Sequence, residues 1–208
     1  MQNPLGSRRA LTWSGPGSTM IEMTGSRRDY WNQRYVERSW PKEPSPWLVA
    51  NTDLLPEPGH VLDVAGGTGR NAVWLAQRGW DVTIVDVSDV ALALATERAE
   101  ATSVQLHTNL QDLRDEPLPA GPWDLILLFH YLDRELFPAL ASVIEAGGLL
   151  IGALATVANL ERNERPALPY LIEETELPSL VRDLEIVRYE EGWQDDRHDA
   201  RFVARSCR

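Results

Sequence analysis

Three carboxylates stand at the ends of three successive apolar runs, where their type and spacing could serve ligand binding. Asp63 closes the first run, Asp86 closes the second, and Asp112 follows the third. Consecutive parallel strands end at one edge of an α/β sheet, and ligands bind in the crevice outside that edge. We therefore expect these acids to surround one site, although each could instead cap the helix that follows it.

A glycine-rich turn, Ala65-Gly-Gly-Thr-Gly69, separates the first acid from a helical pattern. Gly67, Gly69 and Ala72 satisfy the spacing G-x-G-x-x-G/A, which is the dinucleotide-binding fingerprint. Asp86 follows at the distance of about 20 residues that this fingerprint requires. The pattern on its own is consistent with an NAD(P)-dependent oxidoreductase. It is also consistent with glycines that merely permit a tight strand-to-helix turn.

The acid before the turn discriminates between two cofactors. A dinucleotide presents its pyrophosphate to the helix N-terminus, where free N–H groups and the helix dipole favour an anion. The Asp63 carboxylate would repel that anion. S-adenosylmethionine has no phosphate and carries a sulfonium and an ammonium group, which a carboxylate attracts. The residues therefore favour S-adenosylmethionine, with Asp86 accepting hydrogen bonds from the ribose hydroxyls and Asp112 near the adenine edge.

The composition limits the class of protein. The chain has 208 residues, of which 43% are hydrophobic, and a formal net charge of −11. We expect one globular domain and no nucleic-acid partner, because such binding rests on clustered Lys and Arg. No apolar segment approaches the ~20 residues of a membrane span. Cys207 is the only cysteine, which fits a cytoplasmic protein. His60, His107 and His198 lack ligand spacing, so no metal is expected.

The chain beyond residue 59 alternates between strand-like and helix-like patterns. Near-continuous apolar runs, typical of parallel strands covered on both faces, occur at residues 60–64, 81–86, 104–108, 124–129 and 149–153. Helical patterns occur at residues 70–78, 90–101, 134–144 and 174–181. This alternation predicts a doubly wound α/β sheet with right-handed crossovers. Two later runs, 184–189 and 200–205, predict an antiparallel hairpin at one sheet edge.

The N-terminal part of the chain differs in composition from the rest. The expected divisions are a flexible segment at residues 1–27 and a single domain at 28–208, comprising a helical cover at 28–55 and a Rossmann-like core at 60–208. Within the cover, Trp31, Arg34 and Tyr35 fall on one face of a short helix. That face could pack on the core, or it could form a lid over the cofactor. Trp40 and Trp47 could wall an apolar acceptor pocket.

The stretch from Tyr30 to the C-terminus resembles the class I S-adenosylmethionine-dependent methyltransferases, and most of all their small-molecule branch of tellurite-resistance and thiopurine methyltransferase-like proteins. The resemblance lies in four stretches, Tyr30-Trp-Asn-Gln-Arg-Tyr35, Glu43-Pro-Ser-Pro-Trp-Leu48, residues 63–88, and Arg165-Pro-Ala-Leu-Pro-Tyr-Leu-Ile172 leading into Tyr189-Glu-Glu-Gly192. It implies a Rossmann-like seven-stranded sheet, mostly parallel, with an antiparallel C-terminal hairpin. Two positions depart from the family pattern: Ala65 replaces the usual glycine, and Ala153-Leu-Ala-Thr156 replaces an acid-aromatic pattern.

This resemblance implies an enzyme that transfers a methyl group in line from S-adenosylmethionine to a small-molecule acceptor, releasing S-adenosylhomocysteine. A non-catalytic S-adenosylmethionine-binding protein remains an alternative, beside the oxidoreductase. The resemblance also implies that Arg34 meets the methionine carboxylate. The expected cofactor-binding residues are Trp31, Arg34, Tyr35, Asp63, Ala65, Gly66, Gly67, Gly69, Asn71, Asp86, Val87, Ser88, Asp112, Leu113 and Phe129.

A catalytic side chain is optional for methyl transfer, because positioning alone can supply ~7–11 kcal/mol. A general base is needed only where the acceptor must lose a proton. The candidates are His130 and Tyr131, at the end of the fourth expected strand, and Asp133 is expected to cap the next helix. Arg162 and Arg165 could meet an anionic acceptor or lie solvated at the surface. The expected assembly is a monomer or homodimer without a membrane partner.

Overall fold

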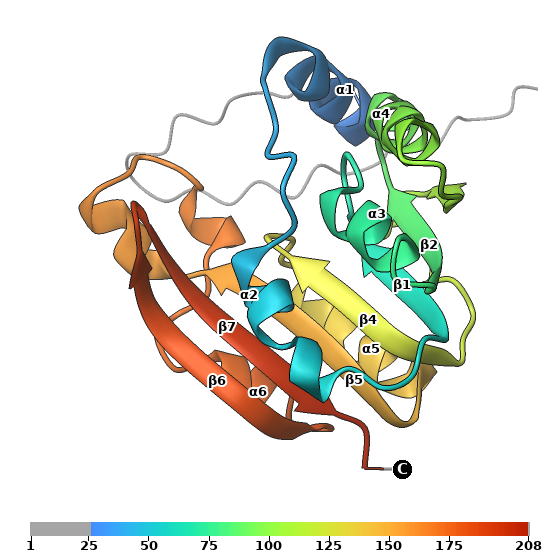
Figure 1. The fold of residues 1–208 in the computed structure, drawn as a ribbon. Coiled ribbons are helices and arrows are strands. Elements are labelled where there is room, and N and C mark those ends of the chain that lie inside the picture. Colours follow the sequence, from blue (N-terminus) through green and yellow to red (C-terminus); the bar gives the residue numbers. More distant parts are fainter. Residues whose placement is uncertain (1–25, 208) are drawn as a thin grey trace, which may run out of the picture.

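The computed structural model describes residues 26–207, which contain a single seven-stranded sheet. The strands are β1 (His60–Val64), β2 (Asp81–Asp86), β3 (His107–Leu110), β4 (Trp123–Phe129), β5 (Ile144–Ala155), β6 (Glu185–Gln194) and β7 (Arg197–Arg205). Their spatial order is β3-β2-β1-β4-β5-β7-β6 (Figure 1). The first five strands pair in parallel, whereas β7 runs antiparallel to both β5 and β6. The expected fold class and the expected hairpin at the sheet edge are confirmed.

Strand order reverses between β1 and β4. From β1 the chain proceeds through β2 to β3 on one side, and it then returns to β4 and β5 on the other. In doubly wound sheets, this switch point opens the crevice in which ligands bind, outside the carboxyl ends of the strands. The loops that follow β1, β2, β3 and β4 therefore surround one candidate site.

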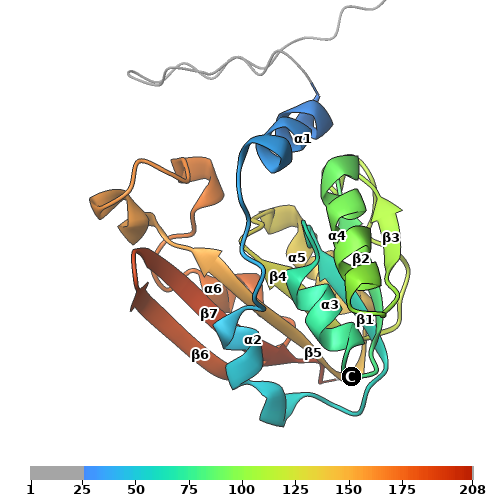
Figure 2. The ribbon, with the colours of Figure 1, turned by 45° about the horizontal axis from the view of Figure 1, so that its top comes forward.

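Helices cover both faces of the sheet (Figures 1 and 2). The α-helices are α1 (Arg27–Glu37), α2 (Pro46–Ala50), α3 (Arg70–Ala76), α4 (Asp89–Ala101), α5 (Phe137–Val143) and α6 (Leu177–Leu180). Short 3₁₀ helices are η1 (Thr52–Leu54), η2 (Arg134–Leu136), η3 (Val157–Glu161) and η4 (Leu168–Tyr170). None of the helices between residues 26 and 207 has the length and apolar character that a bilayer span requires.

The central strand β4 shows how the two faces are built. Leu125 and Leu127 join a buried cluster with residues of α2, α3 and α4, whereas Ile126 and Leu128 join a second cluster with residues of α5 and α6. Successive side chains of a strand point to opposite faces. A near-continuous apolar run is therefore what a strand covered on both faces requires.

Several expected elements have different bounds in the structure, among them the third and fifth strands and the last helix. β3 begins at His107, three residues after the expected start, and β5 begins at Ile144, where the chain pairs with Trp123 before a bulge. The helix expected at 174–181 is confined to α6, because Thr175 has a φ of 64°, which a right-handed helix excludes. Asp133 caps η2 by accepting a hydrogen bond from the Glu135 N–H at 3.1 Å, as expected.

The N-terminal boundary of α1 is fixed by a capping box. The Ser26 hydroxyl accepts from the Asp29 N–H, and the Asp29 carboxylate accepts from the Ser26 N–H. The Ser26 hydroxyl also donates to the Asp29 carboxylate at 2.9 Å, and this bond, followed by that from the Ser26 N–H, lowers the pKa of Asp29. Ser26 and Arg27, which were expected in the flexible segment, thus belong to the N-terminal turn of α1. The rest of the expected flexible segment, residues 1–25, lies outside the described residues.

A substitution at Ala65 tests whether the backbone of the glycine-rich turn is strained. Its φ is 50°, in the left-handed region that costs a non-glycine residue ~1–2 kcal/mol. We expect Ala65→Gly to raise the free energy of unfolding by ~0.5–1 kcal/mol, after allowance for the greater entropy that glycine loses on folding. This gain corresponds to a rise in Tm of ~1–4 °C, measured by calorimetry. Ala101→Gly, at the end of α4, is the control and should lower Tm; a fall for both variants would contradict the strain argument.

Candidate functional site

The glycine-rich turn after β1 is fastened to the end of β2. The Gly66 N–H donates to the Val85 carbonyl at 3.3 Å, and the Gly67 N–H donates to Asp86 Oδ2 at 2.9 Å. The turn then leads directly into α3, whose N-cap is Gly69. This arrangement brings the first two sequence-predicted acids and the glycines between them into one cluster.

Asp86 is buried, with only 5% of its surface exposed. Its Oδ2 accepts from the Gly67 N–H, and its Oδ1 accepts from the Ser88 N–H at 2.9 Å. Burial raises the pKa of Asp86, and these backbone bonds oppose the rise. The carboxylate that was expected to accept hydrogen bonds from the ribose hydroxyls is thus already bound to two backbone donors. The helix-cap alternative is wrong, because Ser88 caps α4 by accepting from the Ala91 N–H at 3.0 Å.

Asp63 is buried beneath the same turn, with 2% of its surface exposed. Its Oδ2 has no hydrogen-bond partner among the described residues. Burial raises the pKa of Asp63 to about 7; the positive charge of Arg70 opposes this rise and the charge of Asp86 adds to it. Gly66 crosses directly over the carboxyl group, since a Cβ at that position would lie 2.7 Å from Asp63 Cγ and 2.6 Å from Ile84 Cγ1. Only glycine therefore fits there without a shift in its neighbours.

α1 lies beyond the C-terminal edge of the sheet and beside α4 (Figure 2). Tyr35 of this helix reaches the glycine turn, and its hydroxyl would lie 2.7 Å from a Cβ on Gly67. Desolvation, followed by the charges of Asp86 and Asp63, raises the pKa of Tyr35, so its phenol stays protonated. The lid alternative for α1 thus agrees with the position of Tyr35.

Trp31 of α1 and Trp40, which follows the helix, form one aromatic cluster with Tyr35 and Arg34. The Tyr35 ring lies 4.5 Å from Trp40 and 6.1 Å from Trp31, measured between ring centroids. The Arg34 guanidinium lies 5.5 Å from the Trp31 ring, and its buried Nε has no partner among the described residues. An anionic group could therefore pair with Arg34 without displacing an existing bond at Nε.

Asp112 lies in the turn after β3, where its carboxylate is already engaged. Its Oδ2 accepts from Arg27 Nε of α1 at 2.6 Å, and its Oδ1 accepts from the Arg114 N–H at 3.2 Å. The sequence had indicated an adenine contact or a helix cap at this position. The structure contains a turn there rather than a helix, and a pairing with α1 that the sequence did not predict.

Three of the expected cofactor residues have structural partners within the protein. Asn71 is buried and accepts a hydrogen bond from the Ser45 N–H at 2.8 Å, which fixes the segment before α2. Leu113 belongs to the core cluster beneath α5 and α6. Phe129, at the end of β4, packs against the opposite cluster. Trp47, suggested as a pocket wall, is also buried in that cluster and donates its indole N–H to the Phe202 carbonyl at 3.1 Å.

His130 follows β4 on the other side of the switch point, with a φ of 60°. Its Nδ1 lies 2.9 Å from Arg197 NH2. Arginine has no acceptor, so Nδ1 accepts this bond and the ring proton resides on Nε2. Desolvation, with the positive charges of Arg197 and Arg70, lowers the pKa of His130 to about 3. The neutral ring presents an N–H donor, and this environment disfavours a general base at neutral pH.

Tyr131 and Asp199 complete this side of the crevice. Desolvation, to which the charge of Asp133 adds, raises the pKa of Tyr131 to about 12, so its phenol is also a donor at neutral pH. Asp199 of β7 is buried, and its Oδ1 lies 3.7 Å from Arg197 and 4.0 Å from His130 Nδ1. No local sequence pattern indicated Arg197 or Asp199, because the hairpin that carries them reaches the site only through strand pairing.

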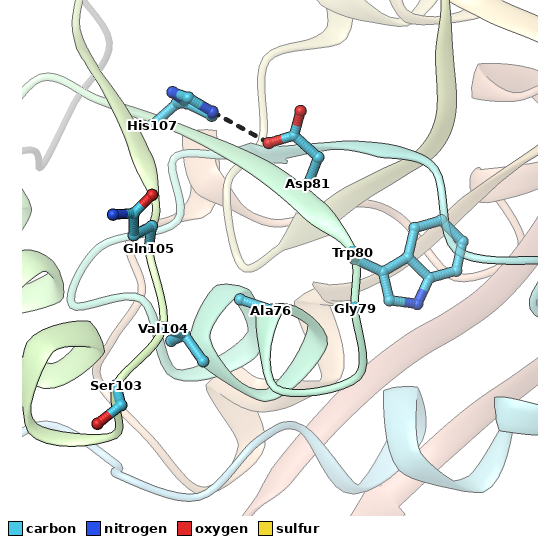
Figure 3. Close-up of a pocket in the computed structure, with 8 residues that line it drawn as sticks. All are labelled: Ala76, Gly79, Trp80, Asp81, Ser103, Val104, Gln105 and His107. Carbon is cyan, nitrogen blue, oxygen red and sulfur yellow. Dashed lines mark ion pairs between the residues drawn. The ribbon is translucent and has the colours of Figure 1, made fainter.

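A surface pocket lies at the opposite edge of the sheet, at the starts of β2 and β3 (Figure 3). Asp81 lies between two histidines there, with its carboxylate 3.0 Å from His107 Nε2 and 3.2 Å from His60 Nδ1. All three side chains are more than half exposed. Among residues 26–207, no group of three or more acidic, histidine or cysteine side chains could hold a metal ion. The pocket is separate from the switch-point site, because it lies where β2 and β3 begin, whereas the switch-point loops follow the ends of the strands.

Comparison with known proteins points to one family. Residues 61–148, which contain the glycine turn, Asp63, Asp86 and Asp112, match the family described as a methyltransferase domain. Together with the relatives reported below, this match supports a class I S-adenosylmethionine-dependent methyltransferase. The resemblance seen in the sequence is thus confirmed at the level of family and cofactor.

This chain matches curated relatives over part of its length. It is 27% identical over 150 residues to "Probable S-adenosyl-L-methionine-dependent methyltransferase TehB" of Haemophilus influenzae, covering 69% of this chain and 52% of that protein. It is 33% identical over 108 residues to the tRNA 5-carboxymethoxyuridine methyltransferase of Escherichia coli, covering 47% of this chain and 41% of that enzyme. The chain thus spans about half the length of the curated relatives that it matches.

Solved structures agree with the fold of this methyltransferase. The crystal structure of TehB from Haemophilus influenzae aligns with a TM-score of 0.66 and 22% identity, covering 86% of this chain and 66% of that one. Magnesium protoporphyrin IX methyltransferase from Synechocystis, with bound S-adenosylhomocysteine, aligns with a TM-score of 0.64 and 21% identity, covering 86% and 97%. At these identities, the alignments support the fold alone.

The site of this methyltransferase fits S-adenosylmethionine in its charges. The unpartnered, buried Asp63 oxygen can receive a cationic donor, and the unpartnered Arg34 Nε can donate to a carboxylate. A cofactor with sulfonium, ammonium and carboxylate groups supplies both partners. A pyrophosphate would instead meet two buried carboxyl groups beside the turn, which is unfavourable wherever they are ionised.

The raised pKa of Asp63 predicts that the stability of the protein depends on pH. Its folded pKa of about 7 exceeds the value of ~3.9 in an unfolded chain. The stability associated with its protonated form is therefore fully present below about pH 4 and is lost as the pH rises through about 7. Asp63→Asn cannot ionise, so its free energy of unfolding relative to wild type should rise by up to ~4 kcal/mol between pH 4 and 8. Denaturant titrations at several pH values measure this difference.

Asp81→Asn, at the exposed start of β2, is the matched control for this experiment. Its stability relative to wild type should change little over the same pH range, because surface ion pairs contribute ~0–1 kcal/mol. Parallel stability curves for wild type and Asp63→Asn would contradict the raised pKa.

Proposed function

We propose that this protein transfers a methyl group from S-adenosylmethionine to a small-molecule acceptor. The observation that carries this proposal is the pair of buried carboxyl groups, Asp63 and Asp86, at a glycine turn covered by Tyr35. We assign the ribose hydroxyls to Asp86, the cationic part of the cofactor to Asp63, and the methionine carboxylate to Arg34. Val87 and Ser88, in the loop after β2, complete this set, with Asp112 on the adenine side.

The reaction places few chemical demands on the chain. When bound, S-adenosylmethionine supplies a methyl carbon already activated by the sulfonium. The residues of the chain then bind and orient the acceptor, and such positioning is worth up to ~7–11 kcal/mol in well-oriented systems. Arg197 and the His130 Nε2–H provide donors on the acceptor side. These donors favour an acceptor that carries a hydrogen-bond-accepting or anionic group.

Two features support a small molecule over a nucleic acid. The formal net charge is −11, whereas binding to a phosphate backbone rests on clustered basic residues. The magnesium protoporphyrin IX methyltransferase, which shares the fold, has a small molecule in its name. The relative from Escherichia coli that methylates tRNA makes nucleic acid the competing possibility for the acceptor. Location in the cytoplasm and a monomeric or homodimeric assembly remain predictions.

Ligand-dependent stabilisation tests the cofactor, and turnover tests the activity. S-adenosylhomocysteine and S-adenosylmethionine should each raise Tm, since a ligand at 100 times its Kd adds ~2.7 kcal/mol to stability. Stabilisation by NAD(P)H alone would favour the oxidoreductase alternative. A screen of small molecules and of tRNA, followed through S-adenosylhomocysteine release, then separates the enzyme from a non-catalytic binding protein and identifies the acceptor.

Asp86 provides the sharpest test of the cofactor assignment. Hydrogen bonds to a charged acceptor contribute ~1.5–3 kcal/mol each, so loss of the carboxylate in Asp86→Ala should weaken S-adenosylhomocysteine binding at least ~30-fold. The same change leaves the Gly67 and Ser88 N–H groups without their acceptor, so stability should also fall by ~1–3 kcal/mol. Calorimetric titration and thermal melting measure the two effects separately.

Asp86→Asn keeps one acceptor oxygen and should be milder on both measures, so it preserves the test if the alanine variant does not fold. Asp81→Ala removes the exposed acid at the other end of β2 and should leave the affinity unchanged. Unaltered affinity in both Asp86 variants would overturn the proposed cofactor geometry.

The lowered pKa of His130 predicts that this residue does not act as a general base at neutral pH. Because its pKa is about 3, the profile of kcat/KM against pH should contain no histidine ionisation between pH 5 and 8. His130→Gln retains an N–H donor and should lower kcat less than ~10-fold, measured with the acceptor identified by the screen. A loss of ~10²–10⁴-fold, together with the disappearance of an ionisation near pH 6.5, would instead identify His130 as the general base. His107→Gln, at the opposite sheet edge, is the control.

A further inference from the structure

α1 is held against the rest of the protein by polar contacts rather than by burial. None of its residues belongs to the buried core. Two anchors join its side chains to other side chains: Asn32 accepts from Ser88 Oγ at 2.6 Å and donates to Asp89 at 2.8 Å, and Arg27 forms an ion pair with Asp112 in the turn after β3. Arg28 Nε also donates to the Val87 carbonyl at 3.3 Å. A helix held in this way can separate from its neighbours without exposing a large apolar surface.

The Arg27 anchor joins two carboxylates with different surroundings. Its Nε donates to Asp112 Oδ2 at 2.6 Å, and its NH2 donates to Asp115. The hydrogen bond to Asp112 is the main reason that the pKa of Arg27 is raised. The Asp112 side chain is 22% exposed, whereas that of Asp115 is 71% exposed. Only Asp112 was assigned to the cofactor, so Asp115 reports on the ion pair alone.

Both anchors lie on loops that carry assigned cofactor residues. Asn32 contacts Ser88 in the loop after β2, and Arg27 contacts Asp112 in the turn after β3. The other end of α1 places Tyr35 against Gly67 in the turn after β1. One helix therefore contacts the three loops that surround the site. Its position and that of the Asp112 carboxylate are mechanically linked through Arg27.

We infer that Arg27 is a positioning residue, which orients Asp112 and latches α1 over the bound cofactor. This inference rests on the proposed function. A carboxylate oxygen can accept more than one hydrogen bond, so Asp112 can keep Arg27 while it accepts a donor from the cofactor. Departure of the cofactor then requires that the ion pair break. The pair is partly exposed and confers limited stability, as a reversible latch requires.

The rate of S-adenosylhomocysteine dissociation tests this role. Arg27→Gln should accelerate dissociation about tenfold in stopped-flow displacement experiments, while Tm changes by less than ~2 °C. Arg27→Lys should restore part of the slow rate, because it keeps the charge but not the paired geometry. Higher ionic strength should accelerate dissociation from wild type more than from Arg27→Gln. Arg38→Gln, which removes the same charge just beyond the C-terminus of α1, should leave the rate unchanged.

A double-mutant cycle separates the latch from the adenine contact. Asp115→Asn should also accelerate dissociation, and combining it with Arg27→Gln should add less than the sum of the two effects. Equal dissociation rates for Arg27→Gln and Arg38→Gln would overturn the latch while leaving the proposed function intact. Faster association with tighter binding in Arg27→Gln would also overturn it, because α1 would then obstruct the site.

Hydrogen exchange of the free protein makes the test independent of the cofactor. Amides of α1 should exchange faster in Arg27→Gln than in Arg38→Gln, with exchange in β1 and β4 unchanged. If wild type binds no S-adenosylhomocysteine, the proposed function fails, but this comparison still reports on the latch. Equal exchange of α1 in the two variants would overturn it.

Discussion

The bond between the Asp86 carboxylate and the Gly67 N–H is the contact on which the site depends. It joins the turn after β1 to the loop after β2, and the second oxygen of the same carboxylate fixes Ser88 at the start of α4. Strand pairing brings the ends of β1 and β2 side by side, but this bond sets how their loops face each other. The acid that we propose to bind the ribose is therefore also a structural residue, so its two roles must be measured separately.

Burial of two acids so close together accounts for much of what surrounds them. Desolvation raises the pKa of both Asp63 and Asp86, and Arg70 opposes the rise at Asp63. Tyr35 covers the turn with a phenol that their charges help to keep protonated. An acidic pocket of this kind favours a cationic ligand and disfavours a phosphate. The same electrostatics thus explain both the choice of cofactor and the pH dependence expected of the free protein.

The sequence predicted local features well and long-range contacts poorly. β1 and β2 have the expected bounds, because period, length and flanking turns define a buried strand without reference to the rest of the chain. Burial of Asp86 was not foreseen, since an acid at a strand end is usually solvated. The pairing of Arg27 with Asp112 joins residues 85 positions apart. Such contacts depend on how α1 packs against the rest of the fold, and no local sequence pattern predicts them.

The family match covers one half of the site but not the other. Residues 61–148 match the methyltransferase domain and contain the glycine turn, Asp63 and Asp86, which are the cofactor side. Arg197 and Asp199 lie on β7, beyond that match, and they approach His130 because β7 pairs with β5 beside β4. α1 also lies outside the match. The family match therefore supports the methyl donor, whereas the proposed acceptor side and the proposed closure of the site involve segments outside that match.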